Sequence, residues 1–148
     1  MMGGPLENLE LYRQMLDETF ERRSVVLAYL YGSQARGDAG SLSDVDVAVL
    51  FGPEVLESER FDRVLRLVGE LGSLFRRNDV YVVDLAEAPP LLRHRVYYDG
   101  RLLYCVDDTI RVRFETQALR DYVDTEPLRK IKRQYILQHF GSPSGRRT

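Results

Sequence analysis

The chain has 148 residues, 44% of them hydrophobic and 30% charged, and its 21 Lys and Arg against 23 Asp and Glu give a formal net charge of -2. This length suits one compact domain with a buried core and excludes two full enzyme domains. The slightly acidic charge excludes a protein that coats nucleic acid or acidic membranes by bulk positive charge, so no direct nucleic-acid binding is expected.

Hydrophobic periodicity predicts alternating helices and strands along the first two thirds of the chain. Apolar side chains at spacings of three and four indicate helices, and short, almost unbroken apolar runs indicate buried strands. The predicted order is helix 6–23, strand 24–31, a glycine- and serine-rich loop 32–43, strand 44–51, helix 58–77, strand 80–85, a short helix through 91–96 that follows Pro89 and Pro90, and strand 101–106.

The last third of the chain is predicted to be helical. Two aspartates at 107–108 can cap this region, and Pro127 interrupts it because proline lacks the amide donor of a helix interior. The end of the chain has the polar composition of a disordered tail. The expected division is a single domain over 1–140, which includes a helical segment at about 108–140, and a disordered tail over 141–148.

The cysteine content and the apolar runs bear on the compartment. Cys105 is the single cysteine, which excludes an intramolecular disulfide framework and a cysteine-based zinc site and fits a reducing compartment. The start of the chain lacks the basic and apolar regions of a leader, and the apolar runs are far shorter than the ~20 residues of a membrane span. We therefore expect a cytoplasmic protein with no membrane association.

Gly32 and Ser33 directly follow the first predicted strand. A glycine there lets the backbone turn sharply and approach a ligand, and a serine offers a hydroxyl and an amide donor to phosphate oxygens. Because Gly-Ser is a common turn dipeptide, it does not by itself indicate a binding site.

Asp44 and Asp46 stand two residues apart where the second strand is predicted to begin. Side chains alternate across a strand, so both carboxylates are expected on one face, opposite a set of core-facing valines. Such a pair suits Mg²⁺, and a third acid would allow two ions about 3.5–4 Å apart. The alternative is a pair of solvated acids at a strand edge, although acids at the start of an apolar strand need partners or an exposed rim.

The combination of Gly-Ser, a ten-residue gap and Asp-x-Asp is rarer than either part. This segment resembles the signature of the minimal nucleotidyltransferases of the polymerase-beta type. The residues that match its finer form are Gly32, Ser33, Ala35, Arg36, Gly37, Ser43, Asp44 and Asp46. The stretches 84–104 and 111 onward are similar to the antitoxin branch of that family, the MNT partner in HEPN/MNT toxin/antitoxin pairs.

This resemblance implies an α/β (α+β) nucleotidyltransferase fold, with a small mixed sheet flanked by helices and a C-terminal helical segment. It implies a Mg²⁺-dependent antitoxin, using two ions, that transfers AMP from ATP onto a tyrosine hydroxyl of a HEPN ribonuclease toxin, with which it would form a hetero-oligomer. In the implied site Gly32 and Ser33 grip the triphosphate, Asp44 and Asp46 hold the metal, and Arg36 neutralises phosphate charge.

The sequence departs from the family at the third carboxylate. The family carries it on the strand predicted over 80–85, where our register places Tyr81 at the corresponding position. Strand alternation favours Asp79, on the face of Tyr81, whereas the tendency of strand ends to reach such sites favours Asp84. We take Asp84 as the third catalytic carboxylate and keep Asp79 as the alternative. Without a third acid, metal binding survives but the general base is weakened.

Two other functions are compatible with the motif. One is an antitoxin with weakened catalysis that neutralises its toxin by binding and occlusion. The other is a small-molecule nucleotidyltransferase of the aminoglycoside type, although those enzymes carry an added helical domain for which the chain leaves little room.

Outside the motif the candidates are weaker. His94 and His139 are interpreted as exposed polar residues, because neither has a second histidine at metal-ligand spacing. Cys105 is interpreted as a core residue. The basic run 129–133 is interpreted as a solvated helix face, with a docking surface for a partner or acceptor as the alternative.

Overall fold

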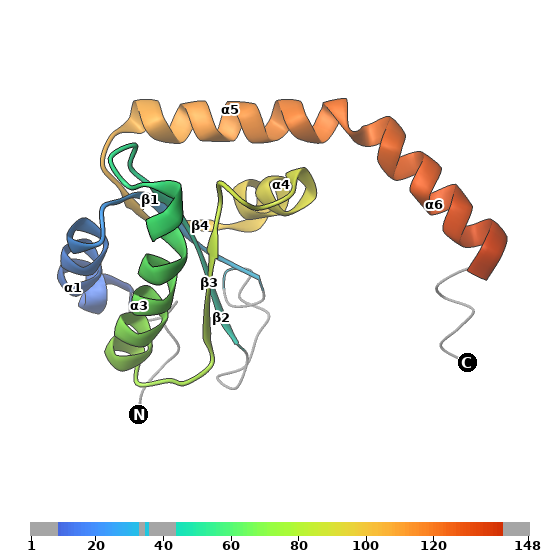
Figure 1. The fold of residues 1–148 in the computed structure, drawn as a ribbon. Helices are drawn as coiled ribbons and strands as arrows, with labels where there is room; N and C mark the ends of the chain where they lie inside the picture. The colour runs from blue at the N-terminus through green and yellow to red at the C-terminus, as the bar shows by residue number, and fades with distance from the viewer. Residues whose placement is uncertain (1–8, 33–34, 36–43, 141–148) are drawn as a thin grey trace.

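The computed structural model describes residues 9–32, 35 and 44–140, and shows a four-stranded sheet with helices on both of its faces (Figure 1). In chain order the elements are α1 (Leu9–Arg22), β1 (Val25–Tyr31), β2 (Val45–Phe51), α3 (Glu57–Phe75), β3 (Val80–Asp84), α4 (Pro90–Asp99), β4 (Arg101–Cys105), α5 (Asp108–Asp124) and α6 (Glu126–Phe140). The predicted tail, 141–148, lies outside the described residues.

The strands are arranged in the order β3-β2-β1-β4. β1 pairs antiparallel with both β2 and β4, whereas β2 and β3 are parallel and are joined through α3. This is a small mixed sheet flanked by helices, as the family resemblance implied. None of the helices in the described part of the chain is long and apolar enough to cross a membrane.

The observed boundaries follow local backbone chemistry. α3 stops at Phe75, two residues earlier than predicted, because Arg76 takes a left-handed conformation with φ 58°. α4 is longer than the predicted short helix: Pro90 occupies its first position, and Gly100 ends it by donating its N–H to the Val96 carbonyl at 2.9 Å. The predicted strands are reproduced to within one residue at each end.

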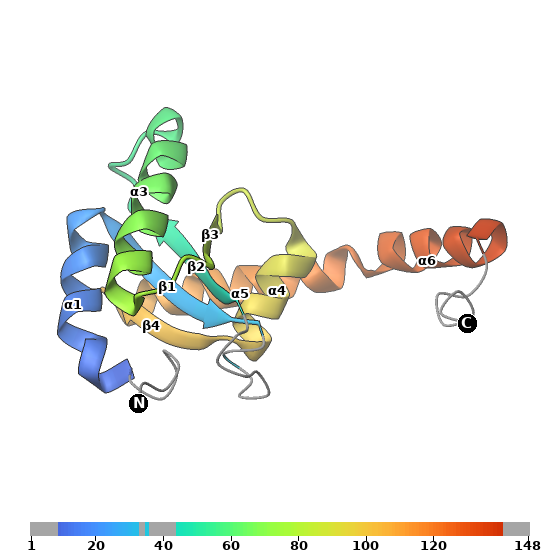
Figure 2. The same cartoon turned by 90° about the horizontal axis from the view of Figure 1, so that it is seen from below.

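Two hydrophobic clusters bury the two faces of the sheet. α1 and α3 cover one face, where the fully buried Leu16, Phe20, Leu67 and Leu71 pack against the sheet. α4 and α5 cover the other face, with Val96 fully buried among strand residues. Figure 2 shows the two helix pairs separated by the strands. Residues of β2 therefore alternate between two different helical layers.

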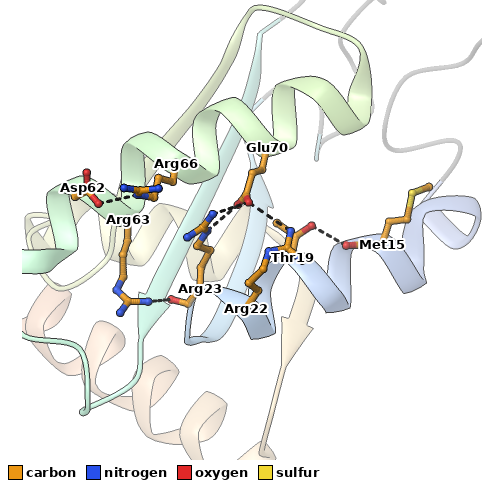
Figure 3. Close-up of polar contacts among 8 residues, drawn as sticks. All are labelled: Met15, Thr19, Arg22, Arg23, Asp62, Arg63, Arg66 and Glu70. Carbon is orange, nitrogen blue, oxygen red and sulfur yellow. Dashed lines mark hydrogen bonds and ion pairs between the residues drawn. The ribbon is translucent and has the colours of Figure 1, made fainter.

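Glu70 of α3 joins α1 and α3 through charged hydrogen bonds (Figure 3). Its carboxylate accepts two bonds from Arg23, at 2.8 and 3.0 Å, and a longer one from Arg22 at 3.4 Å. Arg63 donates to the Arg23 carbonyl at 3.1 Å. The Arg23 guanidinium lowers the pKa of Glu70 below its ordinary value despite partial burial. The two helices on this face are thus held together at their polar edge.

The C-terminal helical region breaks at Thr125, close to the interruption predicted at Pro127. Thr125 ends α5, and its hydroxyl donates to the Asp121 carbonyl at 2.7 Å. α6 contains no buried residue. It extends beyond the sheet on the side where β1 ends and β2 begins, as both orientations show (Figures 1 and 2).

Candidate active site

Asp46 lies in the second position of β2 and is flanked by two tyrosines. The antiparallel register places Tyr31 of β1 opposite it, and the parallel register places Tyr81 of β3 on its other side. Neighbouring strands lie roughly 4.8 Å apart, so both tyrosines adjoin the carboxylate. The register therefore places Tyr81, and no carboxylate of β3, directly beside Asp46.

The predicted alternation along β2 is confirmed. Val45, Val47 and Val49 are fully buried against α1 and α3. Asp46 consequently projects from the opposite face, where it is half-buried, and Asp44 directly precedes the strand and is exposed. The two carboxylates lie at the open end of the face that α4 and α5 cover further along.

Gly32 forms a seat for the Asp46 carboxylate. Gly32 has a φ of +79°, and a Cβ atom at this position would lie 2.8 Å from Oδ2 of Asp46. Position 32 requires glycine for two reasons. Residues with a side chain disfavour this backbone conformation, and any side chain would displace the Asp46 carboxylate. Gly32 and Asp46, which are fourteen positions apart in the sequence, are therefore adjacent in the folded structure.

The electrostatics of the pair favour a bound cation. Burial raises the pKa of Asp46 above its ordinary value, and the negative charge of Asp44 raises it further. Tyr31 responds in the same way: burial raises its pKa, and Asp46 adds to the effect. Within the described residues neither aspartate forms an ion pair. Two carboxylate oxygen donors without a cationic partner fit Mg²⁺, which favours oxygen ligands and retains waters and phosphates in its shell.

A third protein ligand is not found beside the pair. In the part of the chain that the structure describes, no group of three or more His, Cys, Asp or Glu side chains is placed to hold a metal ion.

The structure does not bring Asp84 to the carboxylate pair, which argues against our choice of Asp84 as the third acid. Asp84 pairs in register with Val49, three residues beyond Asp46 and hence roughly 10 Å further along the strand. It faces α3, where it accepts a 2.8 Å bond from Nε of Arg60 and a 3.0 Å bond from the amide of Ala86. This buried carboxylate terminates β3 and anchors it to α3.

Asp79, the alternative third acid, lies near the start of β2, but its carboxylate is bonded to Arg77. Its carbonyl accepts the amide of Val45 at 3.1 Å, and its carboxylate forms two bonds with Arg77 at 2.7 and 2.8 Å. The Arg77 guanidinium lowers the pKa of Asp79, and the pKa of Arg77 is raised mainly by its bond to Asp79, with a smaller contribution from the charge of Asp44. Arg77 thus places positive charge near the start of β2, a contribution that sequence reasoning did not identify.

The remaining predicted ligands fall largely outside the described residues. These are Ser33 and Arg36, which are expected to contact the triphosphate. Ala35 is described and buried, and its amide donates to the Gly32 carbonyl at 3.1 Å. Tyr31 was also missed as a neighbour of the site, although a hairpin pairing of the first two strands would have placed it there.

Comparison with known families gives one match that covers both the sheet and the Gly-Ser/Asp-x-Asp motif. The profile of the family described as "Polymerase beta, Nucleotidyltransferase" matches residues 14–109. The chain belongs to the polymerase-beta nucleotidyltransferase family. The match includes the first strand, the Gly-Ser and Asp-x-Asp motif and the remaining strands of the sheet, so the resemblance inferred from the sequence is confirmed.

This family member is similar to a protein adenylyltransferase in sequence and to chains of toxin-antitoxin structures in fold. It is 29% identical over 120 residues to the protein adenylyltransferase MntA of Aphanizomenon flos-aquae (strain 2012/KM1/D3), covering 76% of this chain and 80% of that protein. It resembles a chain in a crystal structure of a toxin-antitoxin with AMP-PNP, with a TM-score of 0.65, 23% identity and coverage of 81% and 94%. A chain of the complex of tri-AMPylated Shewanella oneidensis HEPN toxin with MNT antitoxin also gives 0.65, with 21% identity and coverage of 87% and 98%.

Proposed function

We propose that this nucleotidyltransferase is a Mg²⁺-dependent antitoxin that transfers AMP from ATP onto a tyrosine hydroxyl of a HEPN ribonuclease toxin. The proposal is supported by the relationship to a protein adenylyltransferase and by the likeness in fold to chains of toxin-antitoxin complexes. In this reaction the tyrosine oxygen forms a bond to the α-phosphorus, the bond to pyrophosphate breaks, and the phenolic proton passes to water.

The observation that carries the proposal is the carboxylate pair Asp44 and Asp46 beside Gly32. Bound Mg²⁺ would neutralise the triphosphate and stabilise charge on the oxygens around the reacting phosphorus. Asp44 and Asp46 would hold that ion, and the lack of a side chain at Gly32 leaves the space that the Asp46 carboxylate occupies. We assign phosphate binding to Gly32 and Ser33 and charge neutralisation to Arg36, as the family motif implies. Positioning and electrostatic stabilisation supply most of the catalysis in such transfers.

A second function, neutralisation by binding alone, is favoured by Tyr81. A tyrosine stands beside Asp46 at the position where the family resemblance implies a carboxylate, while Asp84 is bonded to Arg60 and Asp79 to Arg77. A positioned general base typically contributes about 10²–10⁴-fold to a rate. Without such a base, the protein would either transfer AMP more slowly or neutralise its toxin by binding alone.

The test is to incubate the purified chain with its neighbouring toxin, labelled ATP and Mg²⁺, and to measure AMP on the toxin by intact mass. We expect transfer by the wild type and none by Asp44→Asn with Asp46→Asn. A matched control, Glu18→Gln with Asp62→Asn, removes the same charge from exposed positions on α1 and α3 and should retain transfer.

Three outcomes separate the two functions. Unmodified toxin after incubation with the wild type would refute AMP transfer. Modification by the Asp44/Asp46 double variant would refute the site. If the double variant is inactive but still protects cells from the toxin, binding alone is sufficient for neutralisation.

A further inference from the structure

α6 exposes apolar side chains along its whole length. Leu128 is 67% exposed, Ile131 62% and Phe140 59%, and no residue of the helix is buried. An isolated 15-residue helix is marginal in water, because helices in proteins gain most of their stability from packing an apolar face. The described part of the chain supplies little such packing to α6, so a partner that covers this face would stabilise the helix.

The root of α6 is fixed by a stack of three side chains, one from each of three helices. The guanidinium of Arg129 in α6 lies 3.9 Å from the ring centre of Tyr122 in α5, and the ring of His94 in α4 stacks on Tyr122 at 3.7 Å. Two groups this close must occupy opposite faces of the tyrosine ring. Arg129 also donates to the hydroxyl of Thr125 at 2.7 Å. These contacts set the direction in which α6 leaves the body.

A groove runs between this root and the start of α4. Its volume is about 550 Å³, and its walls include apolar side chains from both helices: Pro90, Leu91, Leu128 and Ile136. Lys132 and Arg133 line the same groove. A surface of this kind receives an apolar ridge of a partner helix and meets acidic side chains at its edge.

The net charge of α6 is opposite in sign to that of the rest of the chain. α6 carries four basic residues and one acid, a net +3, whereas the whole chain carries -2, which leaves -5 for the remainder. Within the described residues, Lys132 and Arg133 form no ion pair. These unused cations favour an acidic partner, and the apolar walls favour a helix over a phosphate backbone, which would leave them uncovered.

We propose that the groove between α4 and α6 is the docking site for an acidic amphipathic helix of the toxin, an inference that rests on the proposed function. The position of α6 suits this role. Because α6 extends on the side where β1 ends and β2 begins, a toxin bound there is held on the side of Asp44 and Asp46 (Figures 1 and 2). Docking would supply both the packing that α6 lacks and the local concentration of the acceptor tyrosine.

The test measures binding of the full chain to the purified toxin by titration calorimetry without ATP, so that transfer does not contribute. Lys132→Glu reverses a charge in the groove, and Lys130→Glu makes the same change on the other side of the exposed helix. Ile136→Ser removes an apolar wall, and Leu137→Ser is its neighbour outside the groove. We expect each groove variant to weaken binding at least tenfold and each control to bind within twofold of the wild type.

The outcomes distinguish this inference from the proposed function. Circular dichroism first confirms that all four variants retain their helices. If the groove variants bind like the wild type while the wild type modifies the toxin, the docking site is refuted and AMP transfer stands. If the wild type neither binds nor modifies the toxin, both fail. Loss of self-association, or of binding to a single-stranded RNA probe, with toxin binding intact would assign the groove to a second copy or to RNA and refute the proposal.

Discussion

Gly32 and Asp46 occupy adjoining space so closely that a single added methyl group would lie 2.8 Å from the carboxylate oxygen. We predict that Gly32→Ala lowers AMP transfer by more than tenfold, because the added Cβ displaces the Asp46 carboxylate from its seat. The positive φ of Gly32 adds a stability cost on the order of 1–2 kcal/mol. Urea denaturation and initial rates of toxin modification measure the two effects separately.

Gly69 provides the matched control for that substitution. It lies within α3, and a Cβ atom built there meets nothing within 4 Å. Gly69→Ala should therefore raise stability by about 0.5–1 kcal/mol, the usual gain from replacing a helical glycine, and leave transfer unchanged. If both alanine variants lost the same activity, the seat at Gly32 would have no special role.

Asp84→Asn separates structural from catalytic carboxylates. Asp84 is bonded to Arg60 on the face opposite Asp46, so we expect the variant to melt at a lower temperature but to transfer AMP within about twofold of the wild type at 25 °C. Asp46→Asn should show the reverse, with a retained melting temperature and no transfer. A folded Asp84→Asn protein that has lost transfer would return Asp84 to the active site.

Tyr81→Asp tests whether the missing carboxylate limits the rate. The substitution places an acid beside Asp46 in the neighbouring strand, where it completes a three-carboxylate set. We predict at least a tenfold faster transfer at saturating Mg²⁺, within the range of a positioned base. Tyr81→Asn removes the same ring without adding charge and should give no such gain. Equal rates for both variants would show that the ring, and not the missing acid, is what matters.

The bond between Glu70 and Arg23 predicts a specific loss of stability in acid. The pKa of Glu70 is lower in the folded state, so its contribution is complete above the unfolded value of about 4.3 and is lost as the pH falls through the folded value. Glu70→Gln should cost about 1 kcal/mol at pH 7, given the partial exposure of the pair, and should flatten this acid decline. Asp62→Asn, which breaks an exposed pair on the same helix, should change the free energy of unfolding by less than half as much.

Local patterns predicted the helices and strands and the alternation along β2, since these depend on short-range periodicity. The alternation of Asp44 and Asp46 with buried valines follows from the two-residue period of a strand. The surroundings of Asp84 could not be predicted in this way: Arg60, which binds it, lies 24 residues away on α3, and no local pattern indicates that contact.

Long-range packing also changed the interpretation of the C-terminal half. His94 was expected to be an exposed polar residue, yet it is only partly exposed and stacks on Tyr122, 28 positions later. The basic run 129–133 could not be assigned from the sequence, because the groove that includes Lys132 and Arg133 also needs the prolines at the start of α4. Such surfaces exist only after distant elements are brought together.

The exposure of α6 has a consequence for the lifetime of the protein in a cell. A helix that is marginal without a partner opens often, and open segments are where proteases cut. We therefore expect proteolysis to remove free copies of this chain faster than copies bound to toxin. If the proposed function holds, the cellular amount of this chain would follow the amount of the toxin that binds it.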